Sequence, residues 1–196
     1  LWLDIVGQPG LEGLTALQQT YGLHQLALED VQNGGQSPKL EGFKDHIYLV
    51  LQVPAWRDGK LRFEQLNLFL APGLVISLHA PEQLFDPVRG RLEGGRGIIR
   101  GAGAEYLLYA LSDTAVDHGV PIVRVLTELL FELEGRVANG DADLSQEIYG
   151  VRRELSALMR QSQRQGELLR DLVNPEHELL TGEHAVYWRD CLDHAQ

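Results

Sequence analysis

Two turn signals divide the stretch of the chain that is richest in strand-forming residues. Residues 46–53 are rich in β-forming side chains, the Asp-Gly pair at 58–59 is a typical hairpin turn, and residues 61–70 alternate in polarity. A Pro-Gly pair at 72–73 then leads into the apolar residues 74–79. Strands joined by such short turns pair antiparallel, whereas parallel strands need a long crossover. The pattern therefore predicts an antiparallel meander and not a series of βαβ units.

Helical periodicity takes over in the second half of the chain. Apolar residues recur at helical spacing along residues 104–138 and again along residues 144–173. Pro121 lies inside the first stretch and predicts a kink or a break there. Shorter elements are expected elsewhere, namely a strand at 1–6 and helices at 11–21, 24–31, 81–93 and from about 181 to the end of the chain.

The order of these elements predicts an α+β fold, with an antiparallel-containing sheet in the first half and long helices in the second. A turn signal, Asn-Gly-Asp at 139–141, separates two parts of the chain. We therefore expect an α/β domain at residues 1–138 and a helical hairpin with a truncated stalk helix at residues 139–196. A helix of about 30 residues reaches roughly 45 Å, so the long helices are expected to protrude or to pack on a neighbouring chain.

The charge balance favours cations as binding partners. The chain has 17 basic and 28 acidic residues, a net charge of −11, which repels nucleic acids and anionic lipids. Cys191 is the only cysteine, so a disulfide within the chain and a cysteine-rich zinc site are excluded, and a reducing compartment is expected. The first residues do not have the pattern of a signal peptide. The most apolar window, 66–78, is interrupted by proline and glycine, so no membrane span is expected.

Sequence motifs of the common enzyme classes are missing. The chain has no nucleophile elbow, no dinucleotide fingerprint and no His-Glu-x-x-His sequence among its seven histidines. The glycine-rich residues 94–97 lack the Lys-Ser/Thr pair that completes a phosphate-binding loop. We therefore expect that the protein is not an enzyme.

Carboxylates at short spacings are the remaining chemical signal. Two carboxylates three or four positions apart on a helix share one face and repel each other, unless solvent or a cation compensates. Mg²⁺ is commonly held by one or two carboxylates and several waters, but solvated acidic pairs are also common, so both interpretations stay open. Pairs at these spacings are Asp113 with Asp117, and Asp190 with Asp193, which has His194 beside it. Glu29 and Asp30 form a further acidic group of two adjacent residues.

Four segments of the chain together resemble the cytoplasmic domain of the CorA family of magnesium and cobalt transporters. They are GLHQLALEDVQNGGQSPK at 22–39, FDPVRGRL at 85–92, GAEYLLYALSDTAVD at 103–117 and YWRDCLDH at 187–194. Their order and separations are also similar to those of the family, so the resemblance covers nearly the whole chain.

The chain departs from the family pattern at some positions. Gln25 stands where the family usually has proline, Ser37 where it often has arginine and Glu105 where it often has aspartate. The two C-terminal membrane helices of the family, with Gly-Met-Asn between them, are absent from this sequence. We therefore expect a soluble fragment that ends within the stalk, before the pore.

The resemblance implies an αβα-type cytoplasmic domain that assembles as a homopentamer on the cytoplasmic face of the membrane. In the family, divalent ions between neighbouring cytoplasmic domains hold the channel shut. The matching residues here are Asp30 with Asp190 for one intersubunit site and Glu29 with Asp113 for a second, and Asp193 is expected to assist through water. The implied function is metal sensing that gates a Mg²⁺/Co²⁺ channel, with Mg²⁺ as the bound ion and Co²⁺ or Zn²⁺ as alternatives.

Three other interpretations remain open at this stage. A zinc-transporting branch shares this architecture, and His184 and His194 near acidic residues suit zinc better than magnesium. A helical interaction module without metal function has the same element pattern. A metal-dependent enzyme needs a concave pocket with perturbed acids inside one chain, which the sequence does not indicate.

Overall fold

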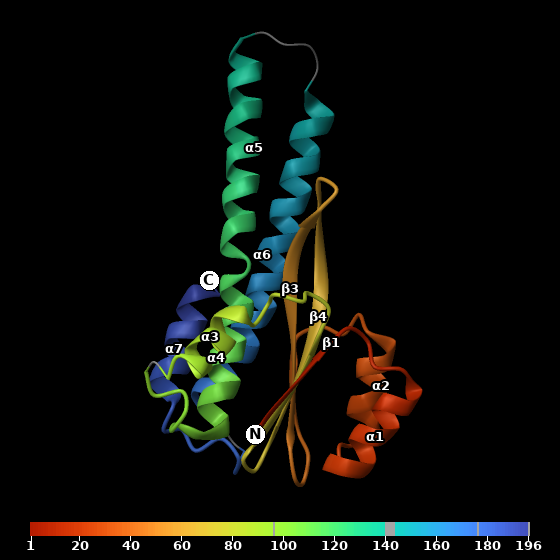
Figure 1. Ribbon diagram of the computed structural model, residues 1–196. Helices are drawn as coiled ribbons and strands as arrows, with labels where there is room; N and C mark the ends of the chain where they lie inside the picture. The colour runs from red at the N-terminus through yellow and green to blue at the C-terminus, as the bar shows by residue number, and fades with distance from the viewer. Residues whose placement is uncertain (96, 140–143, 176, 196) are drawn as a thin grey trace.

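A five-stranded sheet forms the centre of the molecule, in the strand order β1-β5-β4-β3-β2 (Figure 1). The structure is a computed structural model that describes residues 1–95, 97–139, 144–175 and 177–195. The strands are β1 (Trp2–Val6), β2 (Lys39–Gly42), β3 (Ile47–Arg57), β4 (Lys60–Ala71) and β5 (Leu74–His79). The consecutive strands β3, β4 and β5 pair antiparallel, which confirms the predicted meander.

The hairpin formed by β3 and β4 is longer than the sequence pattern predicted. Pairing continues to Arg57 opposite Lys60, across a turn in which Asp58 and Gly59 both have positive φ, 52° and 71°. A type I′ turn requires this conformation at both positions. Pro54 is tolerated inside β3 because β2 pairs only with residues 47–50, so this part of β3 is an edge of the sheet.

The edges of the sheet were predicted only in part. β1 was expected as a strand, but its parallel pairing with β5 was not, because segments so far apart in sequence leave no local turn signal. β2 was not expected at all, since it has four residues and is too short for a clear alternation.

Helices cover both faces of the sheet (Figure 1). Tyr48 and Val50 of β3 pack on one helical layer, whereas Leu49 and Leu51 pack on the other, because successive side chains of a strand point to opposite faces. The first layer is α1 (Leu11–Tyr21) and α2 (Gln25–Asn33), and the second contains α3 (Asp86–Glu93), α4 (Gly103–Asp117), α6 (Ser145–Val173) and α7 (Ala185–His194). This arrangement confirms the expected α+β, αβα-type fold.

The helical run predicted at 104–138 is two helices. α4 ends at Asp117 and α5 (Val120–Ala138) follows after a two-residue break. Pro121 therefore lies in the first turn of α5, where its missing N–H removes no hydrogen bond. The break confirms one of the two outcomes expected for this proline.

Two helix starts were predicted too early, and one expected turn is only partly described. The helix expected at 81–93 begins at Asp86, after a series of turn residues, and the last helix begins at Ala185 instead of near residue 181. Of the turn expected at 139–141, Gly140 and Asp141 lie outside the described residues.

α5 and α6 form a hairpin that extends well beyond the sheet (Figure 1). Its base packs on the long β3–β4 hairpin through Leu61, Ile122, Leu126 and Leu158. No helix in the parts of the chain that the structure describes combines the length and the hydropathy that a bilayer span requires. The division of the chain into domains at residue 138 stays a prediction.

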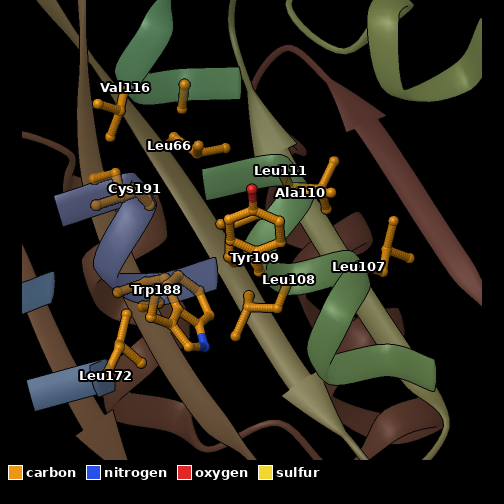
Figure 2. Close-up of a cluster of buried hydrophobic side chains, with 14 of the residues drawn as sticks. Leu66, Leu107, Leu108, Tyr109, Ala110, Leu111, Val116, Leu172, Trp188 and Cys191 are labelled. Atoms are coloured by element: carbon orange, nitrogen blue, oxygen red, sulfur yellow. The ribbon is translucent and has the colours of Figure 1, made fainter. Parts of the chain in front are cut away.

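Trp188 is the centre of the packing between α4, α6 and α7 (Figure 2). Its side chain is completely buried, and its ring meets that of Tyr109 edge to face with centroids 5.7 Å apart. Leu172 of α6 and Cys191 of α7 belong to the same cluster. The carboxyl-terminal helix is therefore held by the main core and not by its own helical propensity.

Ring stacking and hydrogen bonds connect the segment before α2 with the segment before β3. The ring of Phe43 stacks between those of His24 and His46, with centroid distances of 4.5 and 4.9 Å. Nδ1 of His24 accepts a hydrogen bond from the N–H of Leu26, and Nε2 of His46 accepts one from the N–H of His24. Both rings must be neutral to accept these bonds, because a protonated imidazole only donates. Burial lowers the pKa of His46, and the neighbouring His24 and His177 lower it further, against the opposing effect of Asp45.

Replacing Trp188 by alanine is expected to lower the free energy of unfolding by about 3–5 kcal/mol, because a large buried ring leaves a cavity. The control is Val186→Ala on the same helix, where the side chain is 62% exposed and a change within about 0.5 kcal/mol is expected. Urea denaturation of the variants measures both. A loss at Trp188 no larger than that of the control contradicts the assigned role of this side chain.

Acidification is expected to destabilise the protein through His46. Its lowered pKa means that the stabilising contribution is complete above the ordinary imidazole value of about 6.5 and is lost as the pH falls through the folded-state pKa. The melting temperature of the wild type should fall between about pH 7 and about pH 5, and His46→Gln should show a flatter profile. The exposed His118→Gln serves as the control and should keep the wild-type slope.

Candidate metal centre

α4 and α7 lie side by side and bring three metal-ligating side chains together. Asp113 comes from α4, Asp190 and His194 come from α7, and one ligand atom of each lies within 4.8 Å of the others. Asp190 and His194 are four positions apart and therefore share one face of the helix. The buried Trp188 and Cys191 hold α7 against the core, and this packing places the face with the acids next to α4.

The carboxylate of Asp113 is only partly compensated by its neighbours. Its side chain is only 18% exposed, and its Oδ1 atom has no hydrogen-bond partner among the described residues. Burial raises the pKa of Asp113, and the charge of Asp117 raises it further. His194 acts in the opposite direction, with Nδ1 at 3.5 Å from Oδ1 of Asp113 and 3.1 Å from Oδ1 of Asp117.

These side chains fit a divalent cation. A buried carboxylate oxygen without a partner, next to further carboxylates, is stabilised by a positive charge. Carboxylate oxygens suit Mg²⁺, whereas the imidazole of His194 is a ligand that Co²⁺ and Zn²⁺ accept more readily. The donor set of Asp113, Asp190 and His194 is therefore not restricted to magnesium.

The carboxylates of Asp30 and Glu29 on α2, unlike that of Asp113, have partners within the chain. Asp30 is paired with an ammonium group, since Nζ of Lys39 lies 2.6 Å from its Oδ2 atom. Glu29 is exposed, and its Oε1 atom accepts a hydrogen bond of 2.9 Å from the side-chain amide of Gln25. The pKa of Lys39 is raised, because its hydrogen bonds to Asp30 and Glu41 outweigh the opposing effect of burial.

The five predicted site residues fall on two sides of the sheet. Glu29 and Asp30 lie on α2, and Asp113, Asp190 and Asp193 lie on α4 and α7, across the sheet (Figure 1). The structure thus joins Asp113 to Asp190 within one chain, but not Asp30 to Asp190 or Glu29 to Asp113. Those two pairings require a second chain and stay predictions, as does the role of the exposed Asp193.

The two histidines that suggested zinc belong to separate clusters. His194 lies in the Asp113 cluster, whereas Nδ1 of His184 lies 3.2 Å from Oε2 of Glu105. The same Glu105 oxygen accepts hydrogen bonds from the N–H and the hydroxyl of Thr181. Glu105 therefore fastens the segment before α7 to α4.

Lys39 and Glu41 were not among the predicted site residues. They are two positions apart in β2, so both side chains point to the face of the sheet that α2 covers. There Lys39 contacts Asp30, and Glu41 contacts Lys39. Lys39 is part of the segment that resembles the CorA family, but its position becomes meaningful only when β2 is known. The sequence also indicated Asp117 as a neighbour of Asp113, without its contact to His194.

The sequence matches one family over its full length. The family described as CorA-like Mg2+ transporter protein matches residues 1–196. The cobalt/magnesium transport protein CorA of Thermotoga maritima is 30% identical over 197 residues, which cover 98% of this chain and 56% of that protein. The chain thus spans little more than half the length of this relative.

Solved structures share the fold. The soluble domain of CorA from Methanocaldococcus jannaschii has a TM-score of 0.81 at 20% identity, covering 99% of this chain and 78% of that one. The cytoplasmic domain of ZntB from Vibrio parahaemolyticus has a TM-score of 0.77 at 16% identity, covering 99% and 77%. The full-length family match confirms the resemblance carried by the four sequence segments, and the chain belongs to the family of CorA-like Mg²⁺ transporter proteins.

Proposed function

We propose that this chain is the metal-sensing regulatory domain of a CorA-like Mg²⁺/Co²⁺ transporter and lies on the cytoplasmic face of the membrane. It has no enzymatic role in this proposal and acts within a homopentamer. Family membership supports the connection with divalent-cation transport. The sensing role is supported by the cluster of Asp113, Asp190 and His194.

The unpartnered Oδ1 atom of Asp113 is the observation that carries the proposal. Asp113 and Asp117 are four positions apart on α4, and Asp190 comes close from α7, so three carboxylates repel one another beside one imidazole. A divalent cation, when bound, supplies the positive charge that turns this repulsion into attraction. Because α4 and α7 carry the acids, the separation of these helices is linked to the charge at the cluster.

Assembly with further copies is supported by the surface of the α5–α6 hairpin. Phe131, Val137 and Met159 are 67%, 53% and 64% exposed, so the hairpin presents large apolar side chains that a second chain would bury. Acids on α2 and on α7 can share an ion only between two chains, since the sheet separates them within one. An intersubunit site of Asp30 with Asp190, and a second of Glu29 with Asp113, are therefore part of the proposal.

The alternative with a specific observation in its favour is a zinc-transporting relative. His194 adds a nitrogen ligand to the Asp113 cluster, and the fold is also that of the ZntB cytoplasmic domain. The first test below separates the two functions by the ion that stabilises the chain.

Mg²⁺ and Co²⁺ are expected to raise the melting temperature of the 196-residue chain. At ten times the dissociation constant, one site contributes about 1.4 kcal/mol, or a few degrees. Asp190→Ala and Asp30→Ala should reduce this shift, and the exposed Glu128→Ala should not. Thermal melts and size exclusion with EDTA, Mg²⁺, Co²⁺ and Zn²⁺ measure the effect. A response to Zn²⁺ alone supports the zinc-transporting alternative, and no response to any ion contradicts metal sensing.

Asp113→Asn is expected to raise the melting temperature in EDTA and to weaken the shift that Mg²⁺ produces. The raised pKa of Asp113 means that its ionised form is unfavourable in the folded chain. This penalty is present above the folded-state pKa and disappears as the pH falls to about 4, so the gain from asparagine should shrink there. Differential scanning calorimetry across this range checks both points. A lower melting temperature of Asp113→Asn in EDTA means that the chain itself already compensates the charge.

A further inference from the structure

One ammonium group joins two carboxylates at the edge of the sheet that faces α2. Nζ of Lys39 lies 2.6 Å from Oδ2 of Asp30 and 2.7 Å from Oε1 of Glu41. Two of the three N–H donors of the ammonium are thus directed at carboxylate oxygens. Two carboxylates around one centre of positive charge are also the protein ligands that a hydrated divalent cation commonly uses.

The surroundings hold this arrangement in place. The side chains of Lys39, Asp30 and Glu41 are 27%, 22% and 35% exposed, so the charges are partly screened from water. Nζ of Lys39 also lies 5.6 Å from the ring centroid of Tyr48, within the range of a cation–π contact. The amide of Gln65 donates a hydrogen bond to the main-chain oxygen of Asp30 and anchors the end of α2 on β4.

We propose that Lys39 is a tethered counter-cation that competes with divalent ions for Asp30 and sets the ion concentration at which this acid is occupied. The inference rests on the proposed function, in which Asp30 is a ligand of an intersubunit site. While Lys39 is bound, Asp30 is neutralised by its own chain. A divalent ion gains access to Oδ2 only when the ammonium withdraws.

Glu41 gives the withdrawn ammonium a second partner. It lies on the same face of β2 as Lys39, two positions further on, and already accepts a hydrogen bond from Nζ. Lys39 can therefore leave Asp30 without losing all of its compensation. A chain without this carboxylate holds Lys39 on Asp30 more firmly, so the two neighbours of Lys39 have opposite effects on metal affinity.

The test is a titration of the 196-residue chain with Mn²⁺, a paramagnetic divalent probe, in which electron paramagnetic resonance measures the unbound ion. Lys39→Met is expected to lower the half-saturating Mn²⁺ concentration by roughly twofold to fivefold, the effect of losing one partly exposed ion pair. Lys39→Arg, which keeps the charge, should stay near the wild type. Glu41→Gln should raise the half-saturating concentration. Lys60→Met, at the exposed tip of the β3–β4 hairpin, controls for the change in net charge.

A double-mutant cycle with Asp30→Asn assigns the effect to this pair. If Lys39 acts through Asp30, the gain from Lys39→Met disappears in the Asp30→Asn background. Circular dichroism melts show whether each variant is folded. If Lys39→Met does not fold, Glu41→Gln still tests the inference, and an unchanged half-saturating concentration in that variant overturns it.

The possible results separate the inference from the proposed function. Mn²⁺ binding that depends on Asp190 but is unchanged in Lys39→Met overturns the role of Lys39 and leaves metal sensing intact. A gain of the same size in Lys60→Met overturns it as well, because net charge alone then accounts for the change. If neither the wild type nor any variant binds Mn²⁺, both the proposed function and the inference fail.

Discussion

The packing of α7 on the main core is the constraint on which the candidate metal centre depends. α7 has ten residues, too few to be a stable helix by itself in water. Burial of Trp188 against Tyr109 and Leu172 supplies the missing stability. The same packing fixes the rotation of α7, so that the face bearing Asp190 is turned to α4. A rearrangement of this apolar contact therefore changes the distance between Asp113 and Asp190. Conversely, repulsion between these two carboxylates opposes the packing of α7 on α4.

Local patterns in the sequence account for the middle of the fold better than for its edges. The meander and the helices could be predicted because hairpin turns and apolar periodicity are local signals. Pro121 marked the break between α4 and α5, since proline is tolerated in the first turn of a helix but not inside it. The parallel pairing of β1 with β5 had no such signal, because it depends on the packing of the whole sheet. β2 escaped notice for the related reason that it has only four residues.

The same distinction applies to the candidate site. The resemblance to the CorA family indicated Asp113 and Asp190, and the structure brings them together through two helices that are distant in sequence. Exposure, counter-ions and unpartnered atoms could not be predicted, because they depend on neighbours from other elements. Lys39 shows this most clearly, since its contact with Asp30 exists only once β2 has been placed beside the end of α2. A sequence pattern thus identifies acids but does not show whether their charge is already compensated.

The two groups of acids differ in this respect, and the difference has a physical consequence. The charge of Asp113 is compensated only in part by His194, and its Oδ1 atom makes no hydrogen bond with the described residues, so a cation there mainly replaces a repulsion between carboxylates. The charge of Asp30 is already balanced by Lys39, so a cation there has to break a short ion pair first. For acids of similar exposure, the cost of this displacement lowers the apparent affinity. In a domain that senses metal as proposed, the pairing of Glu29 with Asp113 therefore fills at the lower ion concentration, and the pairing of Asp30 with Asp190 fills only when the ion is more abundant.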